Sequence, residues 1–591
     1  MIRRAGLSLL ITALIIVSFS TSTFATPFTE AVQANDEAAL DTLLAGEDAA
    51  KLMNRTDESD MAPIHYAVEL NLRALLSKLV KAGADLEVED PYGRTPLLLA
   101  ADRGDAEVTG YLLRNGAASD AEDDAGFTAM HYTAMSTSVA TMDTLLSWSA
   151  NVDATDDLDR GPLTSAVLAR QPEMIDKLLL AGANPNLRDK NGMGPLHHAV
   201  MIGAGDVVAE LVKQFSDIDM LTGTGLADDA WEGATALHLA IAFDNNELME
   251  QLIAAGASTA IANRKGDTPL MLAIRQAPGS TVTRLLALDA SQENVDGDET
   301  PMSLALERGD VALIGSLVDH GAKLDVPLPS GDLPLLAAVR MNNPELVEVL
   351  LERGARADTT AQEEYPLELA LVNGNLTIAA RLLDSGANPN RVFAPYSTSV
   401  FGTAVPRTPL SIAVRANSLP LTRLLLDRGA DVNQTVPDWD QTLLEQAVEK
   451  ADLPLVRLLV AEGAAITPHT DPSEDSVGLA LTRGYPYLRE VLKADSFDAT
   501  ATDRNGNSYL HLATANVDDP RLIRLLAASG TQVDATNAKG STPMHDAARR
   551  MRGDQVRVLL QLGADATMLD AESRTALDVA RGGAKVVLLT R

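Results

Sequence analysis

The chain has 591 residues, more than the roughly 250 to 300 at which one hydrophobic core stops growing, so it folds as several domains or as a stack of repeats. Hydrophobic residues make up 46% and aromatic residues only 4%, so the apolar content is mainly Ala, Leu and Val, which suits small, closely packed helices. The net charge of −34 excludes nucleic acid as a general partner, because binding phosphates depends on Lys and Arg that displace counterions.

Residues 1–25 have the pattern of a secretory signal peptide. Arg3 and Arg4 form a charged start, residues 5–19 form an uncharged and mostly apolar run, and Thr23-Phe24-Ala25 is a small-x-small cleavage site. The apolar run is shorter than the ~20 residues that span a bilayer, so we expect cleavage and no membrane contact afterwards; an uncleaved anchor is the alternative. An exported chain with 0 cysteines is more typical of bacteria than of eukaryotes, so we expect the periplasm or the medium, with stability supplied by packing alone.

A short motif recurs along the rest of the chain: Thr, then Pro or Ala, Leu or Met, often His, any residue, and Ala. Clear copies are Thr95-Pro96-Leu97-Leu98-Leu99-Ala100 and Thr235-Ala236-Leu237-His238-Leu239-Ala240. The copies begin at residues 62, 95, 128, 161, 194, 235, 268, 300, 333, 365, 408, 442, 475, 508, 542 and 575. Most spacings are 32 to 34 residues, and a degenerate earlier copy begins at Thr29. The chain is therefore an array of repeats.

The motif has the chemistry of a helix start, and the residues after it predict a second helix. Thr accepts a hydrogen bond from an unpaired backbone N–H, and Pro just inside the helix has no N–H to leave unpaired. A second apolar run follows, as at Leu178-Leu179-Leu180, and ends at Gly-Ala, as at Gly182-Ala183, where Gly closes the helix in the left-handed conformation. Neither helix buries its apolar face alone, so the repeats must stack.

On these residues the chain resembles the ankyrin-repeat family, whose 33-residue unit carries T-P-L-H-x-A. The resemblance implies an all-α ankyrin-repeat solenoid of about 17 helix-turn-helix units, with short β-hairpin fingers at Asp-rich turns such as Asp189-Lys190-Asn191-Gly192. In chain order we expect a degenerate N-terminal capping repeat, repeats interrupted by two long finger insertions, and a truncated C-terminal cap: 26–61, 62–215, 216–233 (insertion), 234–390, 391–406 (insertion) and 407–591.

The two insertions lengthen the spacing to 41 residues before Thr235 and to 43 residues before Thr408. Insertions in repeat proteins map to loops on one face, often the binding face. Neutral drift is the alternative, because loops tolerate extra residues at a low entropic cost. The sequence leaves both interpretations open.

No constellation typical of an enzyme stands out from the repeats. Six of the nine histidines occupy the fourth motif position, where the family's histidine hydrogen-bonds within its own repeat: His65, His131, His197, His238, His511 and His545. The sequence has no H-E-x-x-H, G-x-S-x-G or Walker motif and no cysteine nucleophile, so we expect no catalytic residue, no metal site and no cofactor. The alternative is an enzyme or a metal-dependent site assembled in the long insertions.

Acidic residues cluster on three successive fingers and form what we call the acidic ladder: Glu87, Glu89, Asp120, Glu122, Asp124, Asp157 and Asp159. Residues 33 apart stack on the same edge of a solenoid, so the ladder is expected to be continuous. Solvated surface charge is the simplest interpretation. A basic partner and weak Ca²⁺ binding through oxygen ligands are the alternatives.

Partners of this family are gripped by fingertip residues and by the exposed edge of the first helix, so bulky side chains there are candidate partner-binding residues. They are Tyr92, Phe127, Met193, Trp231, Phe243, Met341 and Trp439. Core packing against a neighbouring finger is the alternative for these side chains. The resemblance thus implies a non-catalytic, monomeric scaffold that recognises a client protein through its fingers and concave face.

Overall fold

The computed structural model of the chain describes residues 26–213, 217–224, 231–292, 299–361, 364–393, 407–435, 441–467 and 473–590. The expected signal peptide, most of the second insertion and Trp439 lie outside the described residues. The chain forms two compact parts, which we call the N-terminal block, up to Pro301, and the C-terminal block, from Met302.

The helices of the N-terminal block are α1 (Pro27–Gln33), α2 (Glu37–Leu44), α3 (Ala49–Leu52), α4 (Pro63–Glu69), α5 (Arg73–Lys81), α6 (Pro96–Asp102), α7 (Ala106–Arg114), α8 (Ala129–Met135), α9 (Val139–Ser147), α10 (Pro162–Leu168), α11 (Pro172–Leu180), α12 (Pro195–Met201), α13 (Gly205–Lys213), α14 (Ala236–Ala242), α15 (Asn246–Ala254), α16 (Pro269–Gln276) and α17 (Gly279–Ala287). All but the short α3 form consecutive pairs.

The remaining helices begin at the block boundary: α18 (Pro301–Arg308), α19 (Val311–Asp319), α20 (Pro334–Arg340), α21 (Pro344–Glu352), α22 (Pro366–Val372), α23 (Leu376–Asp384), α24 (Pro409–Arg415), α25 (Leu419–Asp427), α26 (Leu443–Glu449), α27 (Leu453–Ala461), α28 (Ser476–Arg483), α29 (Tyr485–Val491), α30 (Tyr509–Asn516), α31 (Pro520–Ala528), α32 (Pro543–Arg549), α33 (Gly553–Gln561), α34 (Ala576–Val579) and α35 (Gly582–Leu589). The described residues therefore hold 35 helices, which are 17 pairs and α3. This confirms the predicted all-α array of about 17 units.

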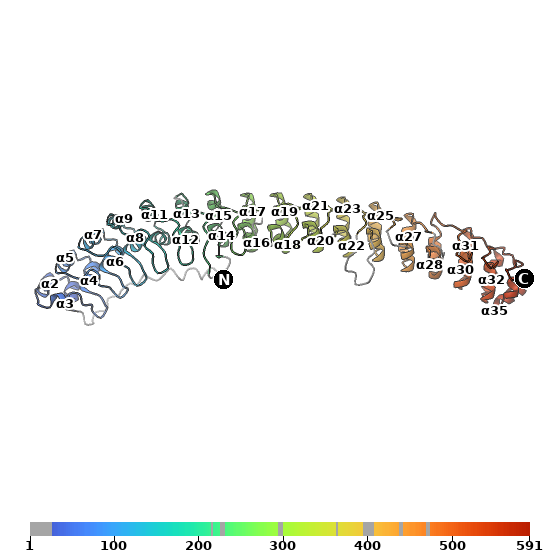
Figure 1. Ribbon diagram of the computed structural model, residues 1–591, viewed down its shortest axis with the longest axis horizontal. Helices are drawn as coiled ribbons and strands as arrows, with labels where there is room; N and C mark the ends of the chain where they lie inside the picture. Colours follow the sequence, from blue (N-terminus) through green and yellow to red (C-terminus); the bar gives the residue numbers. More distant parts are fainter. Residues whose placement is uncertain are drawn as a thin grey trace. The chain divides into compact units, whose positions relative to one another are not determined.

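The pairs stack in the register that the sequence predicts. Within the N-terminal block each first helix packs against the first helix of the next pair, as α8 does against α10, and second helices such as α11 and α13 do likewise. Figure 1 shows the two rows, with α13 and α15 above α12 and α14 in the view. Each first helix thus contacts its own second helix and the first helices on either side.

The helix ends follow the predicted chemistry. Thr268 Oγ1 accepts a hydrogen bond from the backbone N–H of Met271 at 3.3 Å, and Pro269 occupies the first turn of α16. Gly182 follows α11 with a φ of +91°, and a Cβ placed there would meet nothing within 4 Å. Backbone conformation, not lack of space, therefore requires glycine at this helix end.

The core between pairs is aliphatic, and the second helices show which side faces it. In α11, Met174, Ile175 and Leu178 are buried, whereas Leu180 is 82% exposed. Leu178 and Leu180 are two residues apart and therefore lie on different sides of a helix with 3.6 residues per turn. One side of each second helix is thus core, and the other faces solvent.

The loops that follow the second helices are cross-linked by side chains. Asn54 Oδ1 accepts a hydrogen bond from the N–H of Asp85 at 2.9 Å, 31 residues further on. Asp153 Oδ1 accepts one from Asn184 at 2.8 Å in the same way. Such bonds satisfy loop N–H groups that no helix pairs, and they join each repeat to the next.

Candidate protein-binding surface

Many fingers are tight turns organised by one Asp carboxylate, whose place is taken by an Asn amide oxygen at Asn263 and Asn537. Asp90 Oδ1 accepts hydrogen bonds from the N–H groups of Tyr92 and Arg94, both at 2.9 Å, and its Oδ2 accepts one from Arg94 Nε at 2.8 Å. Asp156 repeats the whole pattern with Arg160, and Asp123 repeats its backbone part while its Oδ2 accepts the hydroxyl of Tyr132 in α8. All three carboxylates hold the turns in shape, and the charges of Asp90 and Asp156 are paired with Arg94 and Arg160.

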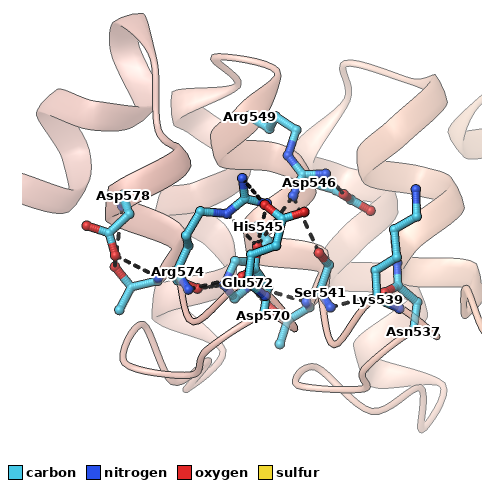
Figure 2. Close-up of polar contacts among 12 residues, drawn as sticks. Asn537, Lys539, Ser541, His545, Asp546, Arg549, Asp570, Glu572, Arg574 and Asp578 are labelled. Carbon is cyan, nitrogen blue, oxygen red and sulfur yellow. Dashed lines mark hydrogen bonds and ion pairs between the residues drawn. The ribbon is translucent and has the colours of Figure 1, made fainter.

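The same arrangement recurs near the C-terminus, in the close-up of Figure 2. Arg574 and Arg549 both form ion pairs with Asp570, at 2.9 and 3.9 Å, and His545 lies beside them. The Arg574 guanidinium holds the pKa of Asp570 at about 2, well below its usual range. This finger turn therefore stays charged and closed throughout the physiological pH range.

Successive turns are held in contact by backbone hydrogen bonds. The N–H of Asp124 donates to the carbonyl of Tyr92 at 3.2 Å, and the N–H of Asp157 donates to Ala125 at 2.9 Å. A Cβ at Gly93, where φ is +73°, would lie only 2.6 Å from the backbone nitrogen of Asp124. The fingers of the N-terminal block are therefore a fixed row of turns rather than independent loops.

The fingers are not β-hairpins in the described part of the chain. That part holds no named strand, and its only β-type pairs are the isolated bridges Ala361–Glu364, Phe393–Arg407 and Thr502–Ser508. The expected hairpins are thus wrong as regular strands. The Asp side chain closes each turn within five residues, which leaves too few residues for a two-stranded ladder.

The six motif histidines hold first helices to the fingers that follow them. His238 Nδ1 accepts a hydrogen bond from the N–H of Thr235 at 3.2 Å, and its Nε2 donates to the carbonyl of Asp267 at 3.0 Å. The contact therefore extends beyond the repeat in which the family pattern places it. Burial lowers the pKa of His238, and that of His197, to about 4. Both imidazoles are structural, because both ring nitrogens are occupied.

The acidic ladder lies on the surface as expected, and all seven of its side chains are exposed. None of them forms an ion pair with Lys or Arg in the described part of the chain. Glu87 Oε1 accepts the N–H of Ala118 at 2.9 Å. No group of three or more His, Asp or Glu residues among those described is placed to hold a metal ion. The geometry gives no support to the Ca²⁺ alternative.

The predicted partner-binding residues in the first fingers differ in exposure. Tyr92 is 53% exposed at a turn, with the Arg94 guanidinium 5.2 Å from its ring. Phe127 is half-buried and stacks on His131, with ring centroids 5.4 Å apart. Met193 is only 4% exposed, so its predicted place on the surface is wrong. It directly follows the turn at Gly192, where the chain bends inward to start α12.

Trp231 and Phe243, predicted separately, meet in the structure. Their ring centroids are 5.5 Å apart, with Phe243 39% exposed at the end of α14 and Trp231 half-buried. Trp231 is fixed by the base of the first insertion, where Thr222 Oγ1 donates to its carbonyl and the Thr222 N–H donates to Ala234 at 2.9 Å. Trp231, at the end of this insertion, and Phe243, at the end of α14, therefore form an aromatic pair on the first-helix side.

In the C-terminal block, Met341 is 43% exposed immediately after α20, as predicted for the edge of a first helix. Val372 ends α22, the next first helix, and is 54% exposed. Trp439 lies outside the described residues, so its predicted role stays a prediction.

One set of surface residues, apart from Phe243, was missed by the sequence interpretation. The last residues of four consecutive first helices, α8, α10, α12 and α14, are all uncharged and at least partly exposed. With the residues that follow α12 and α14 they form what we call the apolar stripe: Met135, Leu168, Met201, Ala242, Ile202 and Phe243. Aligning the repeats at the seventh residue of the first helix would have revealed it.

Asp475 is the most buried of the carboxyl groups with a shifted pKa, and its role is to stabilise a helix end. Asp475 is 1% exposed, and burial raises its pKa to about 6. It caps α28 by accepting the N–H groups of Val477 and Gly478 at 2.9 and 2.8 Å, and Tyr509 Oη donates to its other oxygen. Both oxygens are occupied in a closed core, so the group offers no access to a substrate.

Comparison with known proteins identifies the repeats. A family model described as "Ankyrin repeats (3 copies)" matches residues 64–156, 163–258, 219–296, 237–328, 276–363, 302–392 and 478–589. A second model, described as "Ankyrin repeat", matches residues 407–436. Together the matches cover most of the chain. None of the described helices is long and apolar enough to cross a membrane.

Several curated proteins are similar over part of the chain. E3 ubiquitin-protein ligase KEG of Arabidopsis thaliana is 24% identical over 321 residues, which cover 52% of this chain and 19% of that protein. B-cell lymphoma 3 protein homolog of Mus musculus is 30% identical over 26% of this chain and 36% of its own length. Ankyrin repeat protein nuc-2 of Neurospora crassa is 31% identical over 27% of this chain and 15% of its own length. The chain therefore spans well under half of each relative.

Proposed function

We propose, from the premise that this chain belongs to the ankyrin-repeat family, that it is a non-catalytic scaffold that binds a client protein. The observation that carries the proposal is the Trp231–Phe243 pair. An exposed aromatic on a rigid base is typical of a binding hot spot, because little conformational entropy is lost when a partner covers it. The scaffold acts as a monomer.

We further propose that the chain works after export, in the periplasm or outside the cell. The pattern of residues 1–25 supports export, and the absence of cysteine from the sequence favours a bacterial compartment for an exported chain. The chain isolated from its own host is expected to begin at Thr26, as read by mass spectrometry of its N-terminal peptide. An intact Met1 or a peptide from residues 1–25 on the isolated protein would contradict cleavage.

An enzymatic role is the second candidate, and less supports it. One relative is named an E3 ubiquitin-protein ligase, but the match covers 19% of that protein, so its activity is not carried over. The remaining support would be a site in the insertions, at 225–230 and 394–406, which lie outside the described residues. His197 and Asp475, two buried groups with shifted pKa values, are enclosed in helix caps.

Capture of the client tests the binding function. Affinity purification of the full chain from its native host should retain a client, and Phe243→Ala should weaken that capture about thirtyfold, or by roughly 2 kcal/mol. Trp231→Ala and Trp439→Ala should weaken it as well. The melting temperature should stay nearly unchanged for Phe243→Ala, because this side chain is exposed at a helix end.

Trp148→Ala is the matched control, because Trp148 is 45% exposed at the end of α9, in the row of second helices. This variant should capture the client as the unchanged chain does. Equal capture by the Phe243 and Trp148 variants would show that the aromatic pair is not the interface.

A further inference from the structure

We propose that the first-helix face of the N-terminal block receives an amphipathic, cationic segment of its partner, with the apolar side of the segment on the apolar stripe and its Lys and Arg toward the acidic ladder. This inference rests on the proposed protein-binding function and adds the chemistry of the partner.

The apolar stripe supplies the hydrophobic half of this surface. Met201 is 37% and Phe243 39% exposed, and the other stripe residues are half-buried. The stripe is bounded by charge: Asp102 ends α6, and Arg275 is the seventh residue of α16. The apolar stripe thus crosses four packed helices and has a charged residue at each end. A surface of this kind is suited to a partner segment with a short apolar face.

The negative charge around the apolar stripe favours a positively charged partner segment. Residues 26–160 contain 26 Asp and Glu against 9 Lys and Arg, so less than a quarter of the chain carries half of the net charge of −34. Two nearby arginines are already neutralised, because Arg94 pairs with Asp90 at 2.8 Å and Arg160 pairs with Asp156 at 2.7 Å. The exposed carboxylates of the acidic ladder therefore dominate the field at these fingers.

The spacing fits a helix or a chain of similar width. The acidic fingers lead directly into α6, α8 and α10, and the stripe runs along the opposite ends of α8 and α10. A seven-residue helix is roughly 10 Å long, which is about the diameter of an α-helix with side chains. A segment lying across the first helices would thus contact carboxylates on one flank and apolar side chains on the other.

The arrangement of the carboxylates favours a polypeptide over a metal ion. A Ca²⁺ site needs six to eight oxygen atoms converging on one point. The acidic ladder is instead spread over three fingers, and the described residues contain no group suited to a metal. Distributed charge matches Lys and Arg distributed along a segment.

Binding of a defined probe tests the inference. The probe is an 18-residue peptide of Leu and Lys with helical amphipathic spacing, titrated into the full chain by calorimetry at physiological salt. The first control is a peptide of the same composition in scrambled order, and the second replaces Lys with Glu. The amphipathic cationic peptide should bind at least tenfold more tightly than either control.

Variants locate the binding. Met201→Ser combined with Phe243→Ser should weaken the amphipathic peptide more than tenfold, and Asp124→Asn combined with Asp157→Asn should weaken it and reduce its salt dependence. Leu180→Ser is the matched control, because Leu180 is 82% exposed on a second helix, and it should leave binding unchanged. Circular dichroism checks that each variant is folded, and the conservative Met201→Gln should weaken binding less.

Equal binding of the scrambled peptide would overturn the inference, since attraction would then be charge alone. So would equal loss from Leu180→Ser, or no binding of the amphipathic peptide. A client whose capture depends on Phe243, together with a peptide that does not bind, would overturn the partner chemistry and leave the proposed function standing. A peptide that binds at the stripe without any captured client would count against the proposed function alone.

Discussion

Lowering the pH from 7 to 4 should destabilise the N-terminal block by several kcal/mol, because its motif histidines are buried in the neutral form. Burial lowers the pKa of His65, His131, His197 and His238 from the usual 6.5, and that of the last two to about 4. Below pH 6.5 the unfolded chain binds protons that the folded chain does not bind. The free energy of unfolding therefore keeps its full value above pH 6.5 and decreases as the pH falls toward 4.

The size of the effect follows from the shift. A histidine with a pKa of 6.5 when unfolded and about 4 when folded costs roughly 3 kcal/mol at pH 4. Urea unfolding at pH 7, 5.5 and 4, followed by hydrogen exchange of peptides from α4 to α14, measures this loss. Stability should fall most steeply between pH 6 and 4.

His238→Gln removes the titrating group but keeps an acceptor for the Thr235 N–H, as glutamine does in a capping box. The variant should be less stable at pH 7 and should lose less stability on acidification. His320→Gln, at an exposed position after α19, should change neither property. An unaltered pH dependence in His238→Gln would refute the assignment to the motif histidines.

Leu178→Ala should cost about 2 to 5 kcal/mol of local stability, whereas Leu180→Ala should cost less than roughly 0.5 kcal/mol. Leu178 is completely buried between second helices, and Leu180 is 82% exposed. Leu178→Ala loses apolar contacts and leaves a cavity. Leu180→Ala shortens a side chain that is already in solvent and so loses little packing.

Hydrogen exchange of the peptides covering α9, α11 and α13 measures the effect locally, which suits a stack in which each pair contacts mainly its neighbours. Exchange should accelerate in all three helices for Leu178→Ala and stay unchanged for Leu180→Ala. Similar acceleration in both variants would mean that α11 is not oriented as described.

The fold was predictable because its signals are periodic. Thr or Pro starts fourteen of the sixteen motif copies, and Gly-Ala follows ten second helices, so chance matches at single positions do not mislead. Side-chain orientation at the fingers was not predictable to one residue. Tyr92 and Met193 were both assigned to fingertips, yet they are 53% and 4% exposed. Tyr92 is the third residue of its turn and Met193 is the fifth, where the backbone already enters the helix.

The candidate surface was predicted only in part, because the sequence identifies positions but not the contacts between side chains. Trp231 and Phe243 were identified as separate positions, but their contact depends on Thr222, which closes the base of an insertion with no counterpart in the repeat. Met201 and Leu168 resemble ordinary helix residues in sequence. Only the stacking of successive pairs shows that they form one stripe.

The bonds from motif histidines to later fingers also constrain how such a chain changes in evolution. Because His238 bonds to Asp267 and Asn54 bonds to Asp85, no repeat is complete by itself. Duplication or deletion of a whole repeat restores every crossing bond, since the new neighbour offers the same groups. Loss of half a repeat would leave a buried imidazole unpaired. Whole repeats can therefore be gained or lost more readily than parts of repeats.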